Sequence, residues 1–152
     1  MLEAIVVRSV TRDDAKSVFE ISNDPTVRAN SISTEPITWE NHLKWFDSVV
    51  DNPNVQFFIA ETQSGECVGQ VRFQLHEDAW IVSVSLASAF RGKGLSAQIL
   101  TSAMKISKIS EFTAYVKTSN AASLNLFEKV GYTKIDNILI DGIDYWILKY
   151  VK

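Results

Sequence analysis

Hydrophobic and polar residues alternate in several short segments of the chain, and a period of two predicts β-strands. The clearest case is Trp80–Leu86, where Val82, Val84 and Leu86 are separated by serines. Similar patterns predict strands at residues 4–10, 55–62, 67–75, 112–116, 132–140 and 145–151. Turn residues at 63–66 and 141–142 predict two hairpins.

A period of about 3.6 predicts helices between these strands. Thr11 is placed to cap a helix over residues 12–22, and Asn120 to cap a helix that ends before Gly131. The other expected helices are residues 39–50, with Leu43, Phe46, Val49 and Val50 on the apolar face, and a segment with Ile99, Leu100, Ala103, Ile106 and Ile109 on one side. Residues 23–38, which hold two of the three prolines, are predicted to form a binding loop.

Two glycines stand where the strand at 80–86 gives way to a helix. The junction reads Arg91-Gly92-Lys93-Gly94-Leu95-Ser96. Glycines there let the backbone approach a ligand closely, and the free N–H groups of the first helical turn favour an anion. The sequence thus favours a phosphate-binding loop, with a plain turn carrying solvated basic side chains as the alternative. It fits neither a P-loop nor a dinucleotide-binding fingerprint.

A second segment, Asn-x-x-Ser-x-x-x-Phe-Glu-Lys-x-Gly-Tyr at 120–132, follows this loop. Together the two segments resemble the GNAT superfamily of acetyl-CoA-dependent N-acetyltransferases, and the order of elements agrees along nearly the whole chain. The resemblance implies an α/β (α+β) fold: a mixed, largely antiparallel sheet of six to seven strands with about four helices, split between the fourth and fifth strands.

Composition agrees with one domain spanning residues 1–152. A chain of this length can bury roughly 70% of its unfolded surface, and the single cysteine excludes an internal disulfide. No apolar run reaches the ~20 residues of a membrane helix, and a net charge of -3 argues against a general nucleic-acid partner. We expect a cytoplasmic protein with neither of these partners.

The resemblance implies an acetyl-CoA site and no metal. The residues that it places against the cofactor are Leu86, Arg91, Gly92, Lys93, Gly94, Leu95, Ser96, Asn120, Ser123 and Phe127. The backbone N–H near Leu86 would face the thioester carbonyl. Phe127 stands where many relatives have a tyrosine that protonates the departing thiolate, and Ser96 where glycine or alanine is usual. Ser123 is the candidate acid, with unassisted departure of the thiolate as the alternative.

The N-terminal half resembles, more loosely, acetyltransferases of nucleotide-linked amino sugars of the pseudaminic-acid and spore-coat polysaccharide type. The acceptor site that this implies consists of Asn23, Arg28, Trp39, His42, Trp45 and Arg72. The arginines would bind a diphosphate, a tryptophan would stack on a sugar or base, and His42 would be a candidate base. A structural role for His42 and Trp45 in the second helix is the alternative.

Direct transfer in a ternary complex is the expected mechanism, because Cys67 has no histidine and acid partners that would mark a covalent relay. Two other functions stay open: acetylation of a protein N-terminus or ribosomal protein, and a CoA-binding regulatory module without turnover. The identity of the sugar, the amine position, the nucleotide and the oligomeric state, monomer or homodimer, are not determined by the sequence.

Overall fold

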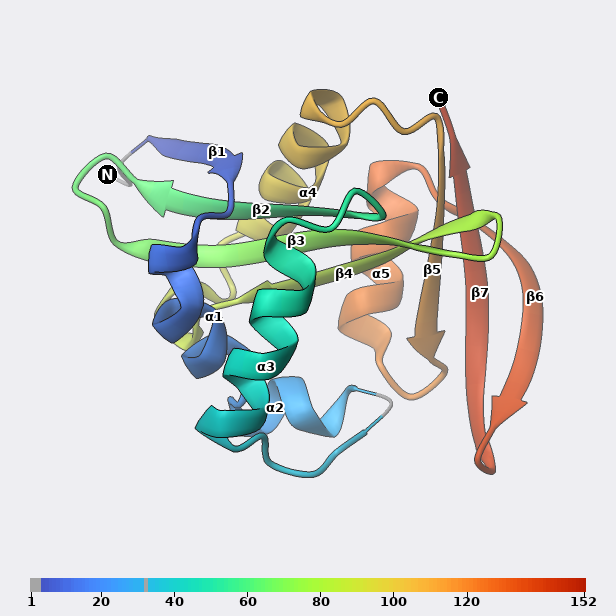
Figure 1. The fold of residues 1–152 in the computed structure, drawn as a ribbon. Coiled ribbons are helices and arrows are strands. Elements are labelled where there is room, and N and C mark those ends of the chain that lie inside the picture. The colour runs from blue at the N-terminus through green and yellow to red at the C-terminus, as the bar shows by residue number, and fades with distance from the viewer. Residues whose placement is uncertain (1–3, 32) are drawn as a thin grey trace.

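The computed structural model describes residues 4–31 and 33–152. Seven strands form one sheet: β1 (Ile5–Ser9), β2 (Val55–Thr62), β3 (Cys67–His76), β4 (Ala79–Leu86), β5 (Glu111–Lys117), β6 (Thr133–Ile140) and β7 (Ile143–Val151). Five α-helices accompany it: α1 (Ala15–Ser22), α2 (Pro25–Ala29), α3 (Trp39–Val50), α4 (Leu95–Ile106) and α5 (Ala121–Val130). Short 3₁₀ helices η1 (Arg12–Asp14) and η2 (Ser88–Phe90) precede α1 and α4. Figure 1 shows the arrangement.

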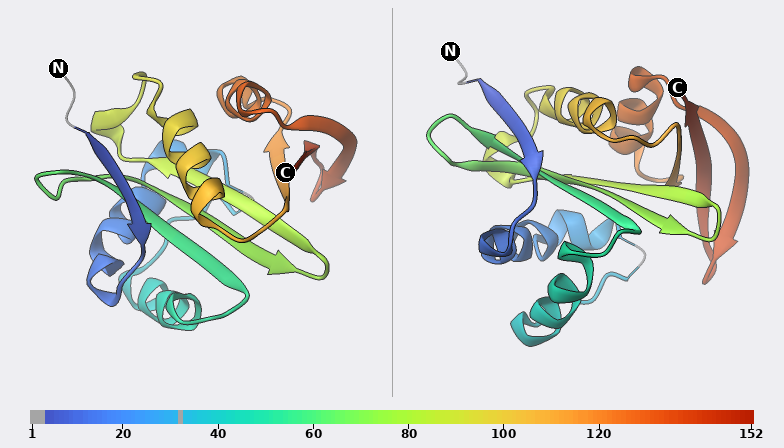
Figure 2. Two further views of the ribbon diagram at one scale, coloured as in Figure 1. Left: turned by 90° about the horizontal axis from the view of Figure 1, so that it is seen from above. Right: turned by 45° about the horizontal axis from the view of Figure 1, so that its top comes forward.

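The strand order is β1-β2-β3-β4-β5-β7-β6. Helices α4 and α5 cover one face of the sheet and α1, α2 and α3 cover the other (Figure 2). Alternation along the strands supplies a core to each face. On the α1–α3 side, Phe46 from α3 packs with Val18 from α1 and with Phe57 and Ile59 from β2.

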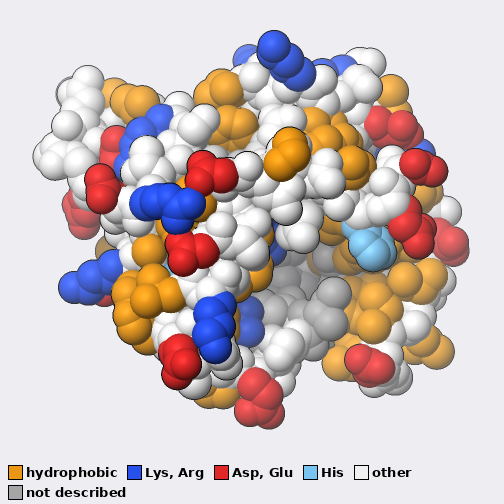
Figure 3. Space-filling model, viewed as in Figure 1, with side chains coloured by type: hydrophobic (Ala, Val, Ile, Leu, Met, Phe, Trp, Pro, Cys, Tyr) orange, Lys and Arg blue, Asp and Glu red, His pale blue; other side chains and the backbone are white. Residues whose placement is uncertain are grey.

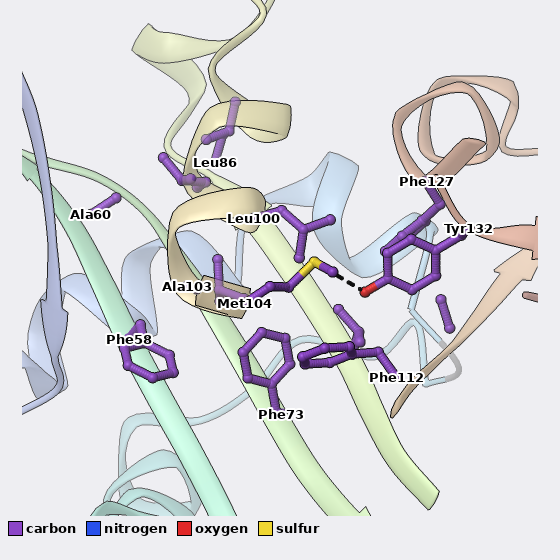
Figure 4. Packing of buried hydrophobic residues seen from close by; sticks show 14 of the residues in the cluster. Phe58, Ala60, Phe73, Leu86, Leu100, Ala103, Met104, Phe112, Phe127 and Tyr132 are labelled. Carbon is purple, nitrogen blue, oxygen red and sulfur yellow. Dashed lines mark hydrogen bonds between the residues drawn. The ribbon is translucent and has the colours of Figure 1, made fainter. Parts of the chain in front are cut away.

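The larger core lies between the sheet and α4 and α5. Figure 4 shows Phe73 and Phe112 side by side, with ring centroids 4.9 Å apart, and Phe127 against Tyr132. The Tyr132 hydroxyl donates to Met104 Sδ at 3.5 Å. This packing fixes α5 against α4, and therefore fixes the position of the helix that carries Asn120 and Ser123.

Among the strands of the described residues, β4 and β5 form the one parallel pair, and they are joined at only two positions, Trp80↔Phe112 and Ile81↔Thr113. By contrast β3 and β4 remain paired from Gly69↔Leu86 to His76↔Ala79. Beyond Ile81 the sheet therefore splits, and the edges of β4 and β5 are free to hold a ligand between them.

The structure confirms the expected fold, with seven strands and one more helix than expected. Helix α2 lies inside the segment predicted as a loop: Asp24 accepts the Thr26 N–H at 2.9 Å and Pro25 occupies the first turn. Ile109 is buried, but it lies beyond the end of α4 in the link to β5. Leu43 is 36% exposed, because the face of α3 turned to the core is that of His42, Phe46 and Val49.

None of the helices in the described part of the chain has the length and apolar character to span a membrane. On the face viewed in Figure 3, acidic and basic side chains are interspersed over the surface.

Candidate active site

A pocket of about 780 Å³ occupies the split between β4 and β5. Its walls are the diverging halves of these strands, the glycine loop with the start of α4, one face of α5, and α2 with the end of α1. Elements that are far apart in sequence thus converge on one cavity.

The edge of β4 that faces the pocket presents backbone groups. The Ala87 N–H donates to Val68 O at 2.8 Å, so odd-numbered residues here direct their N–H and C=O toward β3. Val82, Val84 and Leu86 therefore direct theirs into the split. The Leu86 side chain is buried in the core under α4 (Figure 4), so this residue offers the pocket its backbone.

The glycine loop brings an unpaired helix N-terminus to the pocket. Gly92 and Gly94 have φ values of +75° and +72°, which L side chains rarely adopt. Gly94 is the N-cap of α4 and makes no side-chain cap bond, so the N–H groups of the first turn are available to an anion. Ser96 lines the pocket. A Cβ at Gly92 or Gly94 would meet nothing within 4 Å, so there is room beside the backbone.

The remaining loop residues play different parts. Leu95 is buried in the core, and Lys93 lies over the Phe90 ring at 5.7 Å; neither lines the pocket. Arg91 does line it, but its guanidinium is engaged: it pairs with Asp24 at 2.9 Å and donates to Leu86 O at 3.2 Å. Arg91 therefore joins the loop to α2, across the pocket wall.

The N-terminus of α5 closes the opposite side of the split. Asn120 caps the helix by accepting the Ser123 N–H at 3.2 Å, and its Nδ2 donates to Ser123 Oγ at 3.0 Å. The Ser123 oxygen is the acceptor in this pair, so its hydroxyl hydrogen can be donated into the pocket. Phe127 also lines the pocket but has no polar atom and packs on Tyr132.

Arg72 of β3 lies on the face of the sheet that α1–α3 cover. Among the described residues no hydrogen bond or ion pair engages its guanidinium, which lies 4.9 Å from the Trp45 ring centroid and lines the pocket. Burial lowers the pKa of Arg72 to about 10, so the group remains cationic at neutral pH. Among the described residues this partly buried cation contacts aromatic rings but no anion, so it is suited to an anionic ligand.

Two predicted acceptor residues instead hold the chain in place. The Arg28 guanidinium lines the pocket, but it donates to the carbonyls of Ser22 and Ser33 at 2.8 and 3.1 Å, and to Glu35 O at 3.3 Å. Asn23 exchanges two hydrogen bonds with the Ile37 backbone and does not line the pocket. Both residues organise the segment after α1, and their hydrogen-bonding capacity is largely used there.

The aromatic cluster on α3 is also structural. His42 is 1% exposed, its Nε2 lies 2.8 Å from Ala15 O, and it does not line the pocket. Burial lowers the pKa of this imidazole, but a base must reach its substrate, so the structure places His42 in the core instead of the acceptor site. Trp39 stacks on His42 outside the pocket. Trp45 does not line the pocket, but it contacts Arg72, which does.

The sequence analysis did not identify several polar residues that line the pocket, among them Gln70, Ser83, Ser85 and Lys117. Gln70 and Arg72 are paired with Ser85 and Ser83, so all four side chains of these two pairs share one sheet face. Lys117 donates to Ala29 O at 2.9 Å and so joins β5 to the end of α2. The alternating serines in 80–86 were the sequence feature that could have indicated these polar positions. Without knowledge of the helices that cover this face of the sheet, however, the pattern is typical of a solvent-facing strand.

No group of three or more histidine, cysteine, aspartate or glutamate side chains that could hold a metal ion occurs within residues 4–31 and 33–152.

Comparison with known proteins identifies the family to which this chain belongs. A family model described as acetyltransferase (GNAT) domain matches residues 4–133. The protein YwnH of Bacillus subtilis (strain 168), a candidate phosphinothricin acetyltransferase, is 26% identical over 140 residues, which are 86% of this chain and 85% of YwnH.

Solved structures agree. The crystal structure of a candidate phosphinothricin N-acetyltransferase superposes with a TM-score of 0.82 at 25% identity, covering 97% of this chain and 98% of that one. Spermidine N-acetyltransferase from Vibrio cholerae, in complex with CoA and spermine, has a TM-score of 0.83 at 14% identity, with 97% and 95% covered. At that identity the second likeness concerns the fold alone.

Proposed function

The chain belongs to the acetyltransferase (GNAT) family, and from this premise we propose that it acetylates a primary amine on a small molecule that carries an anionic group. Enzymes of this family are N-acetyltransferases that use acetyl-CoA. Relatives are named for phosphinothricin and for spermidine, so membership does not by itself select the acceptor. The acceptor class that we propose rests on the unpaired Arg72 guanidinium in the pocket.

The residues present are suited to acetyl-CoA. The pyrophosphate would lie against the loop at 91–96, where the free N–H groups at the start of α4 favour negative charge by typically 0.3–1 kcal/mol. The pantetheine arm would pair with the free edge of β4, whose Val84 and Leu86 backbone groups face the split. Its amides would also lie near Asn120.

Acetyl-CoA supplies an activated acyl group, which is transferred as the amine nitrogen bonds to the thioester carbon and the carbon–sulfur bond breaks. The Leu86 N–H would hold the carbonyl oxygen as negative charge develops on it, and such a donor is commonly worth about 2.7–4 kcal/mol. The Ser123 hydroxyl would supply a proton to the leaving sulfur, and the amine would lose its proton to solvent. Direct transfer suffices, because Cys67 does not line this pocket.

A nucleotide-linked amino sugar is the acceptor that we propose first, because its diphosphate would give Arg72 a partner. A polyamine is disfavoured, since its ammonium groups would be placed against that guanidinium. Of the two arginines expected to bind a diphosphate, the proposed arrangement keeps Arg72 alone, because Arg28 is bound to backbone carbonyls. We further propose that residues 1–152 act as a single domain.

The test is a panel of acceptors incubated with acetyl-CoA: nucleotide-linked amino sugars, 2-aminoethyl phosphate, spermidine and a short peptide. Thiol release measures turnover, and mass spectrometry identifies the acetylated product. We expect the phosphate-bearing amines to be preferred. Replacing Arg72→Met should lower kcat/KM for them by about 10- to 100-fold, as for loss of a hydrogen bond to a charged group.

Lys134→Met is the matched control, because this cation also lies over a tryptophan, 4.5 Å from the Trp146 centroid, but outside the pocket. Preferred turnover of spermidine or of the peptide, or equal loss for charged and uncharged acceptors in Arg72→Met, would contradict the proposed acceptor class. Absence of thiol release with all acceptors would favour a CoA-binding module without turnover.

A further inference from the structure

Gln70 has a side-chain oxygen that is buried without a partner. The residue is 5% exposed, lies on β3 two positions before Arg72, and lines the same pocket. Its Nε2 donates to Ser22 Oγ at 3.1 Å, at the end of α1. Among the described residues, Gln70 Oε1 is the buried side-chain nitrogen or oxygen atom that lacks a hydrogen bond.

Such an atom is unusual, because buried polar atoms are nearly always hydrogen-bonded and leaving one unpaired is costly. The position of the Gln70 side-chain amide is fixed by its hydrogen bond to Ser22 on one side, and the pocket lies on the other side. An acceptor atom that is held in this way is suited to a ligand that brings a donor, and an amine about to be acetylated is a donor.

The strand register places Gln70 near the reacting atoms of the proposed mechanism. Gln70 is paired with Ser85, and the preceding residue, Gly69, is paired with Leu86, whose N–H faces the split. Neighbouring strands are roughly 4.8 Å apart, so a glutamine side chain on this face can reach a nucleophile that approaches the thioester from the α1–α2 side.

We propose that Gln70 positions the acceptor amine: Oε1 accepts one N–H of the neutral amine and so directs the nitrogen lone pair toward the thioester carbon. The amide takes no proton, and the proton that the nitrogen loses on acylation goes to solvent. This role rests on the proposed function. Gln70 and Arg72 are roughly 6.6 Å apart along the strand, so together they would select an acceptor whose amine and anion are several ångströms apart.

The experiment uses two bisubstrate analogues in which the CoA sulfur is joined through an acetyl methylene to 2-aminoethyl phosphate. One carries the amide N–H at the acceptor position, and the other replaces that N–H by an ester oxygen. Calorimetric titration compares both analogues and CoA alone on the wild type, Gln70→Met and Arg72→Met. Gln74→Met is the matched control, because Gln74 shares the face of β3 but is exposed and outside the pocket.

We expect the wild type and Gln74→Met to bind the amide analogue about 10-fold more tightly than the ester, since the amide alone supplies a donor to Oε1. Gln70→Met should bind both analogues alike while retaining its affinity for CoA. A merely structural role for Gln70 would weaken all three ligands together. That result, or equal affinity of the wild type for amide and ester, would overturn the proposal.

The outcomes for the two proposals are separable. Loss of affinity for both analogues in Arg72→Met, with no amide–ester difference in the wild type, would leave the anion site standing and remove Gln70. An amide–ester difference that depends on Gln70, with unchanged binding in Arg72→Met, would retain Gln70 and remove the anionic acceptor.

Discussion

Gly69 of β3 lies opposite Leu86 of β4 and has no room for a side chain, so Gly69→Ala tests the geometry of the site. A Cβ at this position would lie 2.6 Å from Ser85 O, 2.9 Å from Leu86 Cδ2 and 3.2 Å from Ile99 Cδ1. The first contact is with backbone, which cannot rotate away, so β4 must shift. The φ of Gly69 lies outside the left-handed region, and alanine therefore brings no conformational strain of its own.

The sign of the change in the free energy of unfolding shows whether the added Cβ clashes with β4. Without a clash, Gly→Ala at an ordinary φ stabilises by about 0.4–1 kcal/mol through the unfolded state. Overpacking typically costs about 1–3 kcal/mol, and for a chain of 150–250 residues each 1 kcal/mol moves the Tm by about 2–4 °C. We therefore expect the Tm to fall by about 2–12 °C, measured by circular dichroism.

The same shift of β4 should also lower kcat, because the Leu86 N–H would be displaced from the thioester oxygen. Complete loss of such a donor commonly lowers kcat by 10²–10³, so a partial displacement should cost about 10-fold, measured by thiol release at a temperature where the protein is folded. Gly65→Ala is the control: its φ of +89° makes alanine strained, but it meets nothing within 4 Å and is remote from the pocket.

An unchanged or raised Tm in Gly69→Ala would refute the steric reasoning. A lowered Tm with kcat equal to that of Gly65→Ala would separate the strand contact from catalysis and remove the Leu86 N–H from the mechanism.

Three further predictions concern proton transfer, the thiol and pH. Ser123→Ala should lower kcat with little change in the KM for acetyl-CoA, and adding Phe127→Tyr to this variant should restore part of the rate. If Ser123→Ala has the wild-type kcat when chemistry is rate-limiting, Ser123 is not the acid. Cys67→Ala should retain activity and the wild-type enzyme should resist iodoacetamide, since burial raises the pKa of the Cys67 thiol; inactivation by alkylation would contradict direct transfer. Burial acts to raise the pKa of Asp14, but hydrogen bonds from Arg8 at 2.8 and 2.9 Å and from the Thr11 backbone outweigh burial, and the net effect is a lowered pKa. The ionised Asp14 carboxylate therefore stabilises the folded state above about pH 4. This contribution to the free energy of unfolding is lost as the pH falls through the lowered pKa. Arg8→Met should flatten that acid dependence in urea unfolding, and an unchanged dependence would count against the pair.

The order of the elements, and the part of the candidate site that depends on local backbone chemistry, could be predicted from the amino-acid sequence. Alternation located the strands, and the glycines at 92 and 94 predicted a loop with positive φ, which the structure has at the start of α4. Asn120 was correctly predicted as the helix cap. These features were readable because periodicity, capping and positive φ are properties of consecutive residues.

Which polar residues face the pocket could not be predicted before the packing of the helices on the sheet was known. Gln70 and Arg72 alternate with core residues as they would on a solvent-exposed strand, and the sequence does not show that α1–α3 cover this face. Helix α3 is oriented so that His42 lies in the core and Leu43 is partly exposed. The His42 imidazole packs against neighbouring aromatic rings and is hydrogen-bonded to Ala15 O, and these contacts stabilise it in the core. Arg28 and Arg72 are the same residue type, but their surroundings differ. Backbone carbonyls engage Arg28, whereas Arg72 lies partly buried beside Trp45 without an acceptor among the described residues. The partners of a side chain come from distant segments, so its role is settled only when the chain has folded.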